Sequence, residues 1–240
     1  MNTETVLEVH HYSNTLFRFK TTRNQSFRFK TGEFAMIGMY NSNLDKNIFR
    51  AYSICSTPYD DHLEFLSIKV ENGPLTSELQ KLMPGDEIFV KPKCTGSLVV
   101  DYLHPKKNLI LLATGTGLAP FMSIVRDPYT YDRFKHVYLF HSARKINELA
   151  YRDTLLDLTQ DLPLTYVDIV TREVYNRNKR FWEYIPEFFD DGFIKERDSV
   201  MVCGSPSLNK QCREYFSHAG FQEGNTGEMG DFLLERAFAD

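Results

Sequence analysis

Leu109-Ile110-Leu111-Leu112 runs through Ala113-Thr114 into Gly115-Thr116-Gly117 and then into Leu118-Ala119-Pro120. Four consecutive apolar residues predict a strand that is buried on both faces, as in a parallel sheet. Two glycines separated by one residue let the backbone turn sharply and let a ligand approach without a Cβ in the way. The proline is typical of the first turn of a helix. The stretch therefore predicts a strand, a tight turn and a helix whose N-terminus can receive a nucleotide pyrophosphate.

The glycine pattern is less specific than the established nucleotide motifs. It has Pro120 where Gly-x-Gly-x-x-Gly has its third glycine, and it lacks the Lys-Ser/Thr pair of a P-loop. Alone, such a turn is a plain strand-to-helix connection at least as often as a nucleotide site. The interpretation depends on the rest of the chain.

Length, charge and cysteine spacing narrow the class of protein. A chain of 240 residues has room for one large domain or two of ordinary size. Its net charge of −4 argues against general nucleic-acid binding. It has no apolar run of membrane-spanning length and no signal pattern, so we expect a cytoplasmic protein without a membrane partner. The spacing of Cys55, Cys94, Cys203 and Cys212 does not match zinc or iron–sulfur ligands, so reduced thiols and no metal site are expected.

The first part of the chain, residues 1 to about 101, reads as short β-strands. They are expected at residues 5–11, 16–20, 27–30, 34–39, 51–54, 63–70, 87–91 and 97–100. Residues 16–20 and 27–30 alternate aromatic and cationic side chains, which places aromatics on one face and cations on the other. Leu75, Leu79 and Leu82 recur at helical spacing after Asn72-Gly73-Pro74. Many short antiparallel strands with one helix favour a small barrel.

The second part of the chain alternates strands with helices. Strands are expected at residues 109–113, 136–141, 164–171, 199–203 and 232–235, and helices near 120–126, 147–158, 182–188 and 207–219. This alternation predicts a parallel sheet with helices on both faces. We therefore expect a β plus α/β fold: an antiparallel β-barrel domain over residues 1–102 and a Rossmann-like α/β domain with a five-stranded parallel sheet over residues 103–240.

The α/β domain carries a cation where an NAD-selective domain carries a carboxylate. The second expected strand runs into Ser142-Ala143-Arg144, and a guanidinium there suits the 2′-phosphate of NADP. Four further arginines could join it: Arg152, Arg172, Arg177 and Arg180. For Arg152 and Arg177 taken singly, a solvated loop arginine is the better interpretation. The stretch Cys203-Gly204-Ser205-Pro206 follows another apolar strand and reads as a second ligand-facing turn at the same sheet edge.

Taken together, these stretches resemble the bacterial subclass of the ferredoxin/flavodoxin–NADP reductase family. The resemblance is carried, in the family's order, by five stretches: residues 50–53 (Arg-Ala-Tyr-Ser), residues 67–77, residues 115–120, residues 203–206 and the tail Glu235-Arg236-Ala237-Phe238. It implies an FAD-binding barrel followed by an NADP-binding domain. The implied activity passes electrons between NADPH and a one-electron carrier protein through bound FAD, with hydride exchanged between nicotinamide C4 and flavin N5.

The resemblance also implies roles for single residues around FAD. Arg50 would pair with the pyrophosphate, Tyr52 would stack on the isoalloxazine, and Ser53 would hydrogen-bond near N5. At the C-terminus Ala237 would lie against the isoalloxazine and Phe238 would stack on the adenine, with a frayed terminus as the alternative. Further implied FAD contacts are Ala51, Ser67, Ile68, Lys69, Asn72, Gly73, Leu75, Thr76, Ser77 and Thr116.

The resemblance also implies which residues bind NADP and which are catalytic. The implied NADP contacts are Gly115, Thr116, Gly117, Arg144, Arg172, Arg180, Cys203, Gly204 and Ser205, and the implied catalytic residues are Ser53, Cys203 and Asp240. No general acid–base pair is expected, although Asp240 or Glu228 could assist proton transfer.

A protein partner is expected to be an acidic ferredoxin or flavodoxin. No acidic residue occurs between Glu8 and Glu33, a segment that contains Arg18, Lys20, Arg23, Arg28 and Lys30. This pattern predicts a cationic docking face, with the polar face of two exposed strands as the alternative. We expect a monomer. The rival functions are an NAD(P)H-dependent free-flavin reductase, the reductase component of an oxygenase, and a non-catalytic nucleotide-binding or electron-relay subunit.

Overall fold

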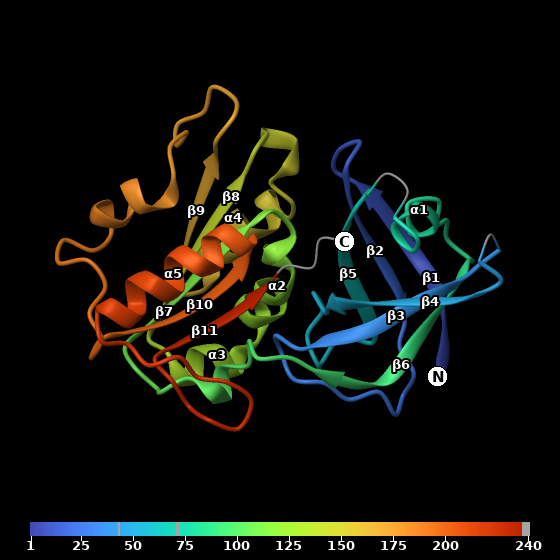
Figure 1. Cartoon of the computed structure of the whole chain (residues 1–240), viewed down its shortest axis with the longest axis horizontal. Helices are drawn as coiled ribbons and strands as arrows, with labels where there is room; N and C mark the ends of the chain where they lie inside the picture. The colour runs from blue at the N-terminus through green and yellow to red at the C-terminus, as the bar shows by residue number, and fades with distance from the viewer. Residues whose placement is uncertain (43, 71–72, 237–240) are drawn as a thin grey trace.

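The computed structural model describes residues 1–42, 44–70 and 73–236. An antiparallel sheet of six strands is followed along the chain by a parallel sheet of five strands (Figure 1). This confirms the expected fold class.

The N-terminal sheet is formed by β1 (Asn2–His11), β2 (Leu16–Thr22), β3 (Phe34–Asn41), β4 (Lys46–Ser53), β5 (His62–Ile68) and β6 (Glu87–Thr95). Their order is β4-β3-β6-β1-β2-β5, and every pairing is antiparallel. An isolated bridge between Ile54 and Phe65 joins the two outer strands. The sheet therefore closes into a barrel, and α1 (Thr76–Leu79) lies at one end of it (Figure 1).

The alternating pattern of β2 has the predicted effect. Phe17 and Phe19 are fully buried in the barrel core, whereas Arg18 and Lys20 are partly exposed. Two expected strands, at residues 27–30 and 97–100, are not strands in the structure. Phe27, Phe29 and Leu98 are nevertheless buried. Their apolar side chains hold irregular connecting segments against the core and do not belong to a strand of the sheet.

The parallel sheet contains β7 (Asn108–Thr114), β8 (His136–Ala143), β9 (Leu164–Val170), β10 (Asp198–Gly204) and β11 (Phe232–Arg236), in the order β11-β10-β7-β8-β9. One face packs against α2 (Ala119–Arg126) and α4 (Arg152–Asp161), and α3 (Pro128–Arg133) follows α2 directly. The other face packs against α5 (Pro206–His218) and the segment 181–193. Helices therefore cover both faces, as expected.

Two of the expected helices are shorter or broken. Residues 182–188 form two 3-10 turns, η4 (Phe181–Glu183) and η5 (Ile185–Glu187), because Pro186 at the start of the second turn has no N–H for a continuous helix. Residues 147–158 divide into η3 (Ile146–Glu148) and α4. Tyr151, directly before α4, has a positive φ of 57°, so the helix cannot run back continuously into the first turn.

The barrel and the parallel sheet share one hydrophobic core cluster. Leu66 and Leu98 from the N-terminal part join Leu109, Leu111 and Phe121 from the α/β part in this cluster. The short turn η1 (Val100–Tyr102) leads from one part to the other. Within the described residues, no helix is long and apolar enough to cross a membrane.

Candidate functional site

The glycine turn after β7 has the predicted conformation. The 3-10 turn η2 (Gly115–Leu118) begins directly at the end of the strand and continues into α2. Gly115 has a φ of +55°, is exposed, and has open space where a Cβ would be. Gly117 is buried: a Cβ there would lie 2.5 Å from the carbonyl carbon of Cys203 and closer still to its oxygen. The first glycine supplies the turn and the second allows the close approach to β10.

The end of β10 meets the end of β7 in the same way. A Cβ on Gly204 would overlap the hydroxyl of Thr114 and lie 2.9 Å from a methyl carbon of Leu208. The Ser205 N–H donates to Thr114 Oγ1 at 3.1 Å, and the Ser205 hydroxyl accepts from the Leu208 N–H at 3.2 Å, capping α5. Two helical N-termini therefore begin at neighbouring points of one sheet edge, an arrangement that favours anions. The sequence did not predict the role of Thr114 in this contact. The only signal for it is its position directly before Gly115.

Cys203 is a buried, neutral thiol at this edge. Its side chain is almost fully buried, and burial raises the pKa of the thiol well above its usual value of 9. A thiol in this state is neither a nucleophile nor a general base at neutral pH. Cys203 can therefore contribute to catalysis only by packing against the ligand, and not by nucleophilic or acid–base chemistry.

Glu235 is a second ionisable residue beside Cys203 that the sequence analysis quoted without assigning it a role. The two residues are register partners of β10 and β11. Glu235 Oε2 accepts from the N–H of Ser97 at 3.0 Å and from its hydroxyl at 3.2 Å. Its Oε1 has no hydrogen-bond partner among the described residues, and burial raises the pKa of the carboxyl. The signal in the sequence is a carboxylate that directly follows the apolar residues Phe232-Leu233-Leu234.

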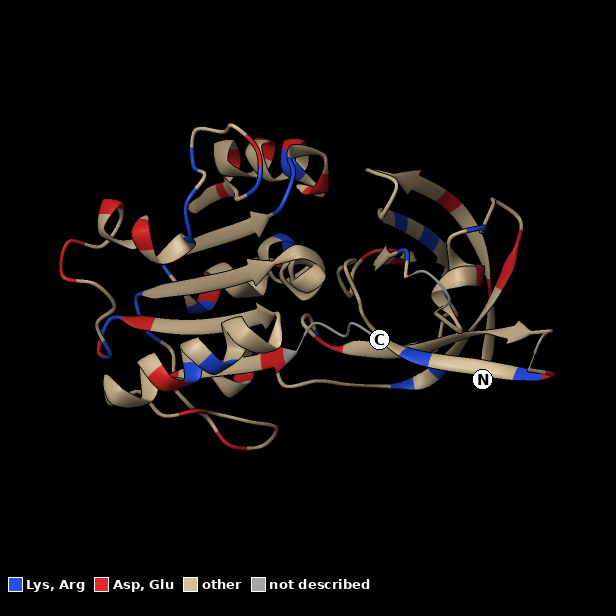
Figure 2. Ribbon diagram, turned by 45° about the horizontal axis from the view of Figure 1, so that its top comes forward, with Lys and Arg blue, Asp and Glu red and all other residues tan. Residues whose placement is uncertain are grey.

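The arginines near the 2′-phosphate position separate into two groups. The Arg172 N–H donates to the Arg144 carbonyl at 2.9 Å, so these two exposed residues are neighbours beyond the ends of β8 and β9. Arg152 Nε pairs with Asp168 at 2.8 Å, and Arg177 lies 3.9 Å from the same carboxylate. Arg180 is exposed at the start of η4. Figure 2 shows Lys and Arg positions in the loops near the tips of the upper strands of this sheet. The structure thus brings Arg144 and Arg172 together, and it engages Arg152 and Arg177 with Asp168.

The four residues Arg50 to Ser53 form the end of β4 and are all partly buried. Tyr52 Oη lies 3.1 Å from Ser67 Oγ on β5, and the Tyr52 ring packs edge-on against Phe65 with centroids 6.5 Å apart. Arg50 donates to the Phe49 carbonyl at 2.9 Å. The structure therefore brings together two of the stretches that carry the resemblance, residues 50–53 and 67–77.

The segment from Gly73 to Ser77 turns tightly into α1. The Ser77 N–H donates to the Gly73 carbonyl at 3.0 Å. Leu75 is buried in the barrel core, so only its backbone can face a ligand. The Thr76 hydroxyl donates to the Val70 carbonyl at 3.4 Å, so its proton already has a protein acceptor.

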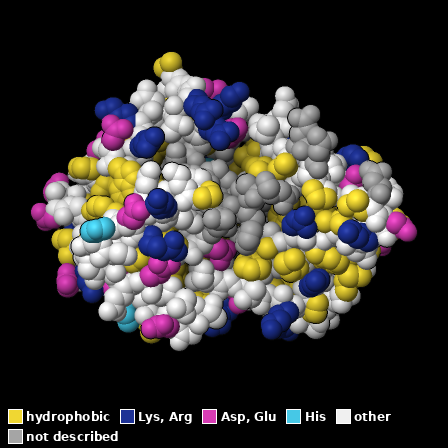
Figure 3. All heavy atoms as spheres, viewed as in Figure 1, with side chains coloured by type: hydrophobic (Ala, Val, Ile, Leu, Met, Phe, Trp, Pro, Cys, Tyr) yellow, Lys and Arg dark blue, Asp and Glu magenta, His cyan; other side chains and the backbone are white. Residues whose placement is uncertain are grey.

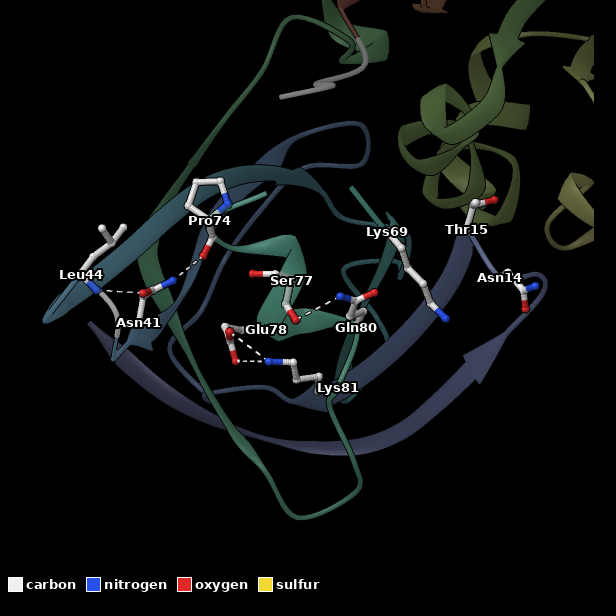
Figure 4. A pocket seen from close by; sticks show the side chains of 10 residues that line it. All are labelled: Asn14, Thr15, Asn41, Leu44, Lys69, Pro74, Ser77, Glu78, Gln80 and Lys81. Carbon is white, nitrogen blue, oxygen red and sulfur yellow. Dashed lines mark hydrogen bonds and ion pairs between the residues drawn. The ribbon is translucent and has the colours of Figure 1, made fainter. Parts of the chain in front are cut away.

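A cavity of about 740 Å³ surrounds α1 at this end of the barrel (Figure 4). It is lined by Asn14, Thr15, Asn41, Leu44, Lys69, Pro74, Ser77, Glu78, Gln80 and Lys81. Lys69 and Ser77 belong to the expected FAD contacts, and the volume suits part of a dinucleotide. With the two helical N-termini and the open Gly115, the residues present fit FAD in the barrel and a dinucleotide at the sheet edge.

Some expected residues lie outside the described part of the chain: Asn72, Ala237, Phe238 and Asp240. Glu228 is exposed in a turn, where its N–H and carbonyl pair with Asn225. Among the described residues, no group of three or more His, Cys, Asp or Glu side chains could hold a metal ion.

The cations expected on the first strands are partly neutralised by ion pairs. Arg18 pairs with Glu8 at 2.7 Å and with Glu64 at 2.8 Å, and Lys20 lies 3.3 Å from Glu8. Arg23 donates to the carbonyls of Pro58, Asp60 and Phe27, and Lys30 pairs with Asp101 at 2.7 Å. The exposed Arg28 likewise donates to backbone carbonyls, those of Gln25 and Phe27, so the ion pairs neutralise only part of this set, and a docking face on these strands stays a prediction.

Comparison with known proteins agrees with this geometry. The model of the oxidoreductase FAD-binding domain matches residues 6–97, and that of the oxidoreductase NAD-binding domain matches residues 111–214. The chain is 45% identical to a ferredoxin–NADP reductase of Azotobacter vinelandii, over 100% of this chain and 98% of the relative. It is also 45% identical to one of Pseudomonas aeruginosa, over 99% and 98%. The crystal structure of a ferredoxin NADP+ reductase from Neisseria gonorrhoeae with bound FAD and NADP superposes with a TM-score of 0.90 at 30% identity, covering 99% of this chain and 98% of that one. The chain belongs to the ferredoxin–NADP reductase family.

Proposed function

We propose that this protein is an FAD-dependent ferredoxin/flavodoxin–NADP+ reductase that moves electrons between NADPH and a one-electron carrier protein. One observation carries the proposal. The flavin stretch at the end of β4 belongs to a barrel that packs, through Cys55, Leu66 and Leu98, in one hydrophobic cluster with the sheet bearing the Gly115–Leu118 turn. A flavin held by the first and a nicotinamide held by the second can therefore meet at the junction. Residues 1–102 and 103–240 serve as the FAD and NADP domains.

FAD, when bound, supplies the hydride and single-electron chemistry, and the protein supplies binding and orientation. Arg50 faces the FAD pyrophosphate as a charge-assisted donor. Tyr52, held by Ser67 and Phe65, offers its ring as a stacking surface, and Ser53 donates near N5. Lys69, Ser77 and the backbone from Gly73 complete the barrel side of the site.

On the NADP side, two helical N-termini and a pair of arginines bind different parts of the ligand. The η2–α2 and α5 N-termini receive the pyrophosphate and the nicotinamide half, framed by Gly115, Thr116, Gly117 and Ser205. Arg144 and Arg172, adjacent through their backbones, bind the 2′-phosphate, and Arg180 extends this basic loop. The ion pairs of Arg152 and Arg177 with Asp168 support the loops from which those arginines project.

Hydride transfer requires close contact and a site without water rather than an acid–base pair. The neutral Cys203 thiol and the closely packed Gly117 and Gly204 leave a surface without bulky side chains on which a nicotinamide can lie. Glu235 lies beside Cys203 with a carboxyl whose pKa burial raises, and we infer that its Oε1 can hold a proton there. The catalytic role of Asp240 remains a prediction.

The carrier protein is an acidic ferredoxin or flavodoxin. Figure 3 shows Lys and Arg side chains among hydrophobic ones, with few acidic ones, over the barrel half of the visible face. Exposed Lys91 and Lys93 alternate along β6, and the Lys91 ammonium lies 4.7 Å from the ring of Phe49, the residue before Arg50. We place the carrier on the outer side of the barrel, over β6 and the flavin strand β4. A monomeric state and a cytoplasmic location remain predictions.

Reduction of a carrier protein tests the proposal. The purified protein should retain FAD and pass electrons from NADPH to ferredoxin or flavodoxin. The double variant Lys91→Glu/Lys93→Glu should slow carrier reduction in a salt-dependent manner while dye reduction continues. Lys107→Glu/Lys210→Glu, at two exposed positions of the α/β part, is the control because it changes the net charge by the same amount. Reduction of free FMN or FAD without reduction of either carrier would favour the free-flavin reductase instead.

A further inference from the structure

Arg126, the last residue of α2, joins the α/β part of the molecule to the barrel. Its guanidinium donates to the backbone carbonyl of Cys55 and, at 3.1 Å, to Glu64 Oε2. Its Nε donates to the Met122 carbonyl one turn earlier at 2.9 Å. The side chain is thereby held at both ends, by its own helix and by two barrel segments.

Glu64 receives one guanidinium from each part of the molecule. Its side chain is only 2% exposed, and Arg18 Nη1 of the barrel binds Oε1 at 2.8 Å while Arg126 binds Oε2. A carboxylate buried to this degree is stable as an anion only when its oxygens are paired. The position of Arg126 is therefore fixed by charge as well as by hydrogen bonds.

Two further polar contacts fix the same end of α2. The Gly32 N–H donates to Ser123 Oγ at 3.0 Å, and the Thr31 hydroxyl donates to Asp127 Oδ2 at 3.0 Å. Around them Phe121 and Met122 pack in one core cluster with Cys55 and Leu66. The C-terminal half of α2 is thus bound to the barrel on two sides.

The two ends of α2 lie at the two halves of the proposed reaction. The helix begins where the Gly115–Leu118 turn ends, and eight residues at about 1.5 Å each make it about 12 Å long. At its far end Arg126 holds the carbonyl of Cys55, two residues beyond Ser53. A short, rigid helix therefore links the NADP turn to the end of the flavin strand.

We propose that Arg126 is a positioning residue, which through its bond to Cys55 sets where the Gly115–Leu118 turn stands relative to the flavin strand. This inference rests on the proposed function. Lysine cannot replace arginine here, because a single ammonium lacks the separate Nε and Nη2 donors that bind the Met122 carbonyl on one side and the Cys55 carbonyl and Glu64 on the other.

The experiment compares Arg126→Lys with Arg133→Lys in the FAD-loaded protein. Arg133 is a matched control: its side chain is 20% exposed against 23% for Arg126, and it donates to the Leu103 carbonyl at 3.0 Å, away from the flavin strand.

Flavin reduction at saturating NADPH is followed by stopped flow, and hydrogen exchange is measured in the peptides containing Cys55 and α2. Arg126→Lys should lower the reduction rate on the order of 10²-fold and increase exchange in both peptides, with FAD content unchanged. Arg133→Lys should keep the wild-type rate.

Glu64→Gln separates positioning from stability. Glutamine keeps an acceptor oxygen but leaves the Arg126 guanidinium without its carboxylate partner, whereas Arg18 keeps Glu8, so this variant should unfold at a lower temperature yet keep most of the reduction rate. A wild-type rate in Arg126→Lys would overturn the inference, as would an equal loss of rate in Glu64→Gln. If NADPH does not reduce the wild-type flavin at all, the proposed function itself fails.

Discussion

Gly117→Ala is the substitution that most directly tests the packing of the nucleotide turn. The added Cβ would lie 2.5 Å from the carbonyl carbon of Cys203, whereas Cβ atoms in proteins do not approach other heavy atoms closer than 3.0 Å. The neighbour is backbone and cannot rotate away, and the carbonyl oxygen of Cys203 is closer still, so the turn and β10 must separate by about 1 Å. Overpacking of this kind costs about 1–3 kcal/mol of stability. A shift of about 1 Å in a reacting group can cost on the order of 10²-fold in rate.

The assay pairs urea unfolding with the rate of flavin reduction by NADPH, and Gly115→Ala is the control. Gly115 has open space at its Cβ position, so alanine there costs only the strain of a positive φ, about 1–2 kcal/mol. We expect similar losses of stability in the two variants and a much larger loss of rate in Gly117→Ala. Equal rates in the two variants would refute the reasoning that close packing of β7 against β10 shapes the nicotinamide site.

Three further predictions concern charge. Replacing Arg144 and Arg172 together with Gln should raise the KM for NADPH but leave the KM for NADH nearly unchanged, and equal effects on both would contradict the 2′-phosphate assignment. Asp231→Asn should cost about 3–5 kcal/mol at neutral pH in chemical unfolding. Burial raises the pKa of Asp231, but the hydrogen bonds from Lys106 and Gln222 and the charge of Lys195 outweigh it and hold the pKa below 3.8. The difference from wild type should therefore vanish as the pH falls through that lower pKa, and a constant difference would count against the ion pair. Burial lowers the pKa of His141 from 6.5 to about 4, so an NMR titration should show its midpoint there. Because the unfolded chain takes up this proton first, stability should fall as the pH drops from 6.5 to 4, and a midpoint near 6.5 would be the contrary result.

The sequence was sufficient to predict the fold because its apolar patterns are set by burial. The run Leu109–Leu112 is buried on both faces, and the alternation around Phe17 and Phe19 points into the barrel core. Where an apolar side chain anchors a loop, as at Phe27 and Leu98, the same signal wrongly predicted a strand. Burial determines where such a side chain goes, but a strand also needs a partner strand for its backbone.

The candidate site was predictable where a local backbone shape matters, as at Gly115 and Gly117. It was less predictable where pairing partners are distant in sequence. Glu64 neutralises Arg18 from 46 residues away, and Arg126 reaches Cys55 from 71 residues away. No local pattern encodes such contacts, since they exist only once the barrel and the α/β part pack together. The same reason hides Glu235, whose environment is formed by Ser97.

Anaerobic titration of the purified protein with NADPH, and separately with NADH, tests the central claim most directly. The claim predicts a yellow protein whose bound FAD is bleached rapidly by NADPH and much more slowly by NADH. A colourless protein that does not take up added FAD would contradict it, as would a bound flavin that NADPH leaves oxidised.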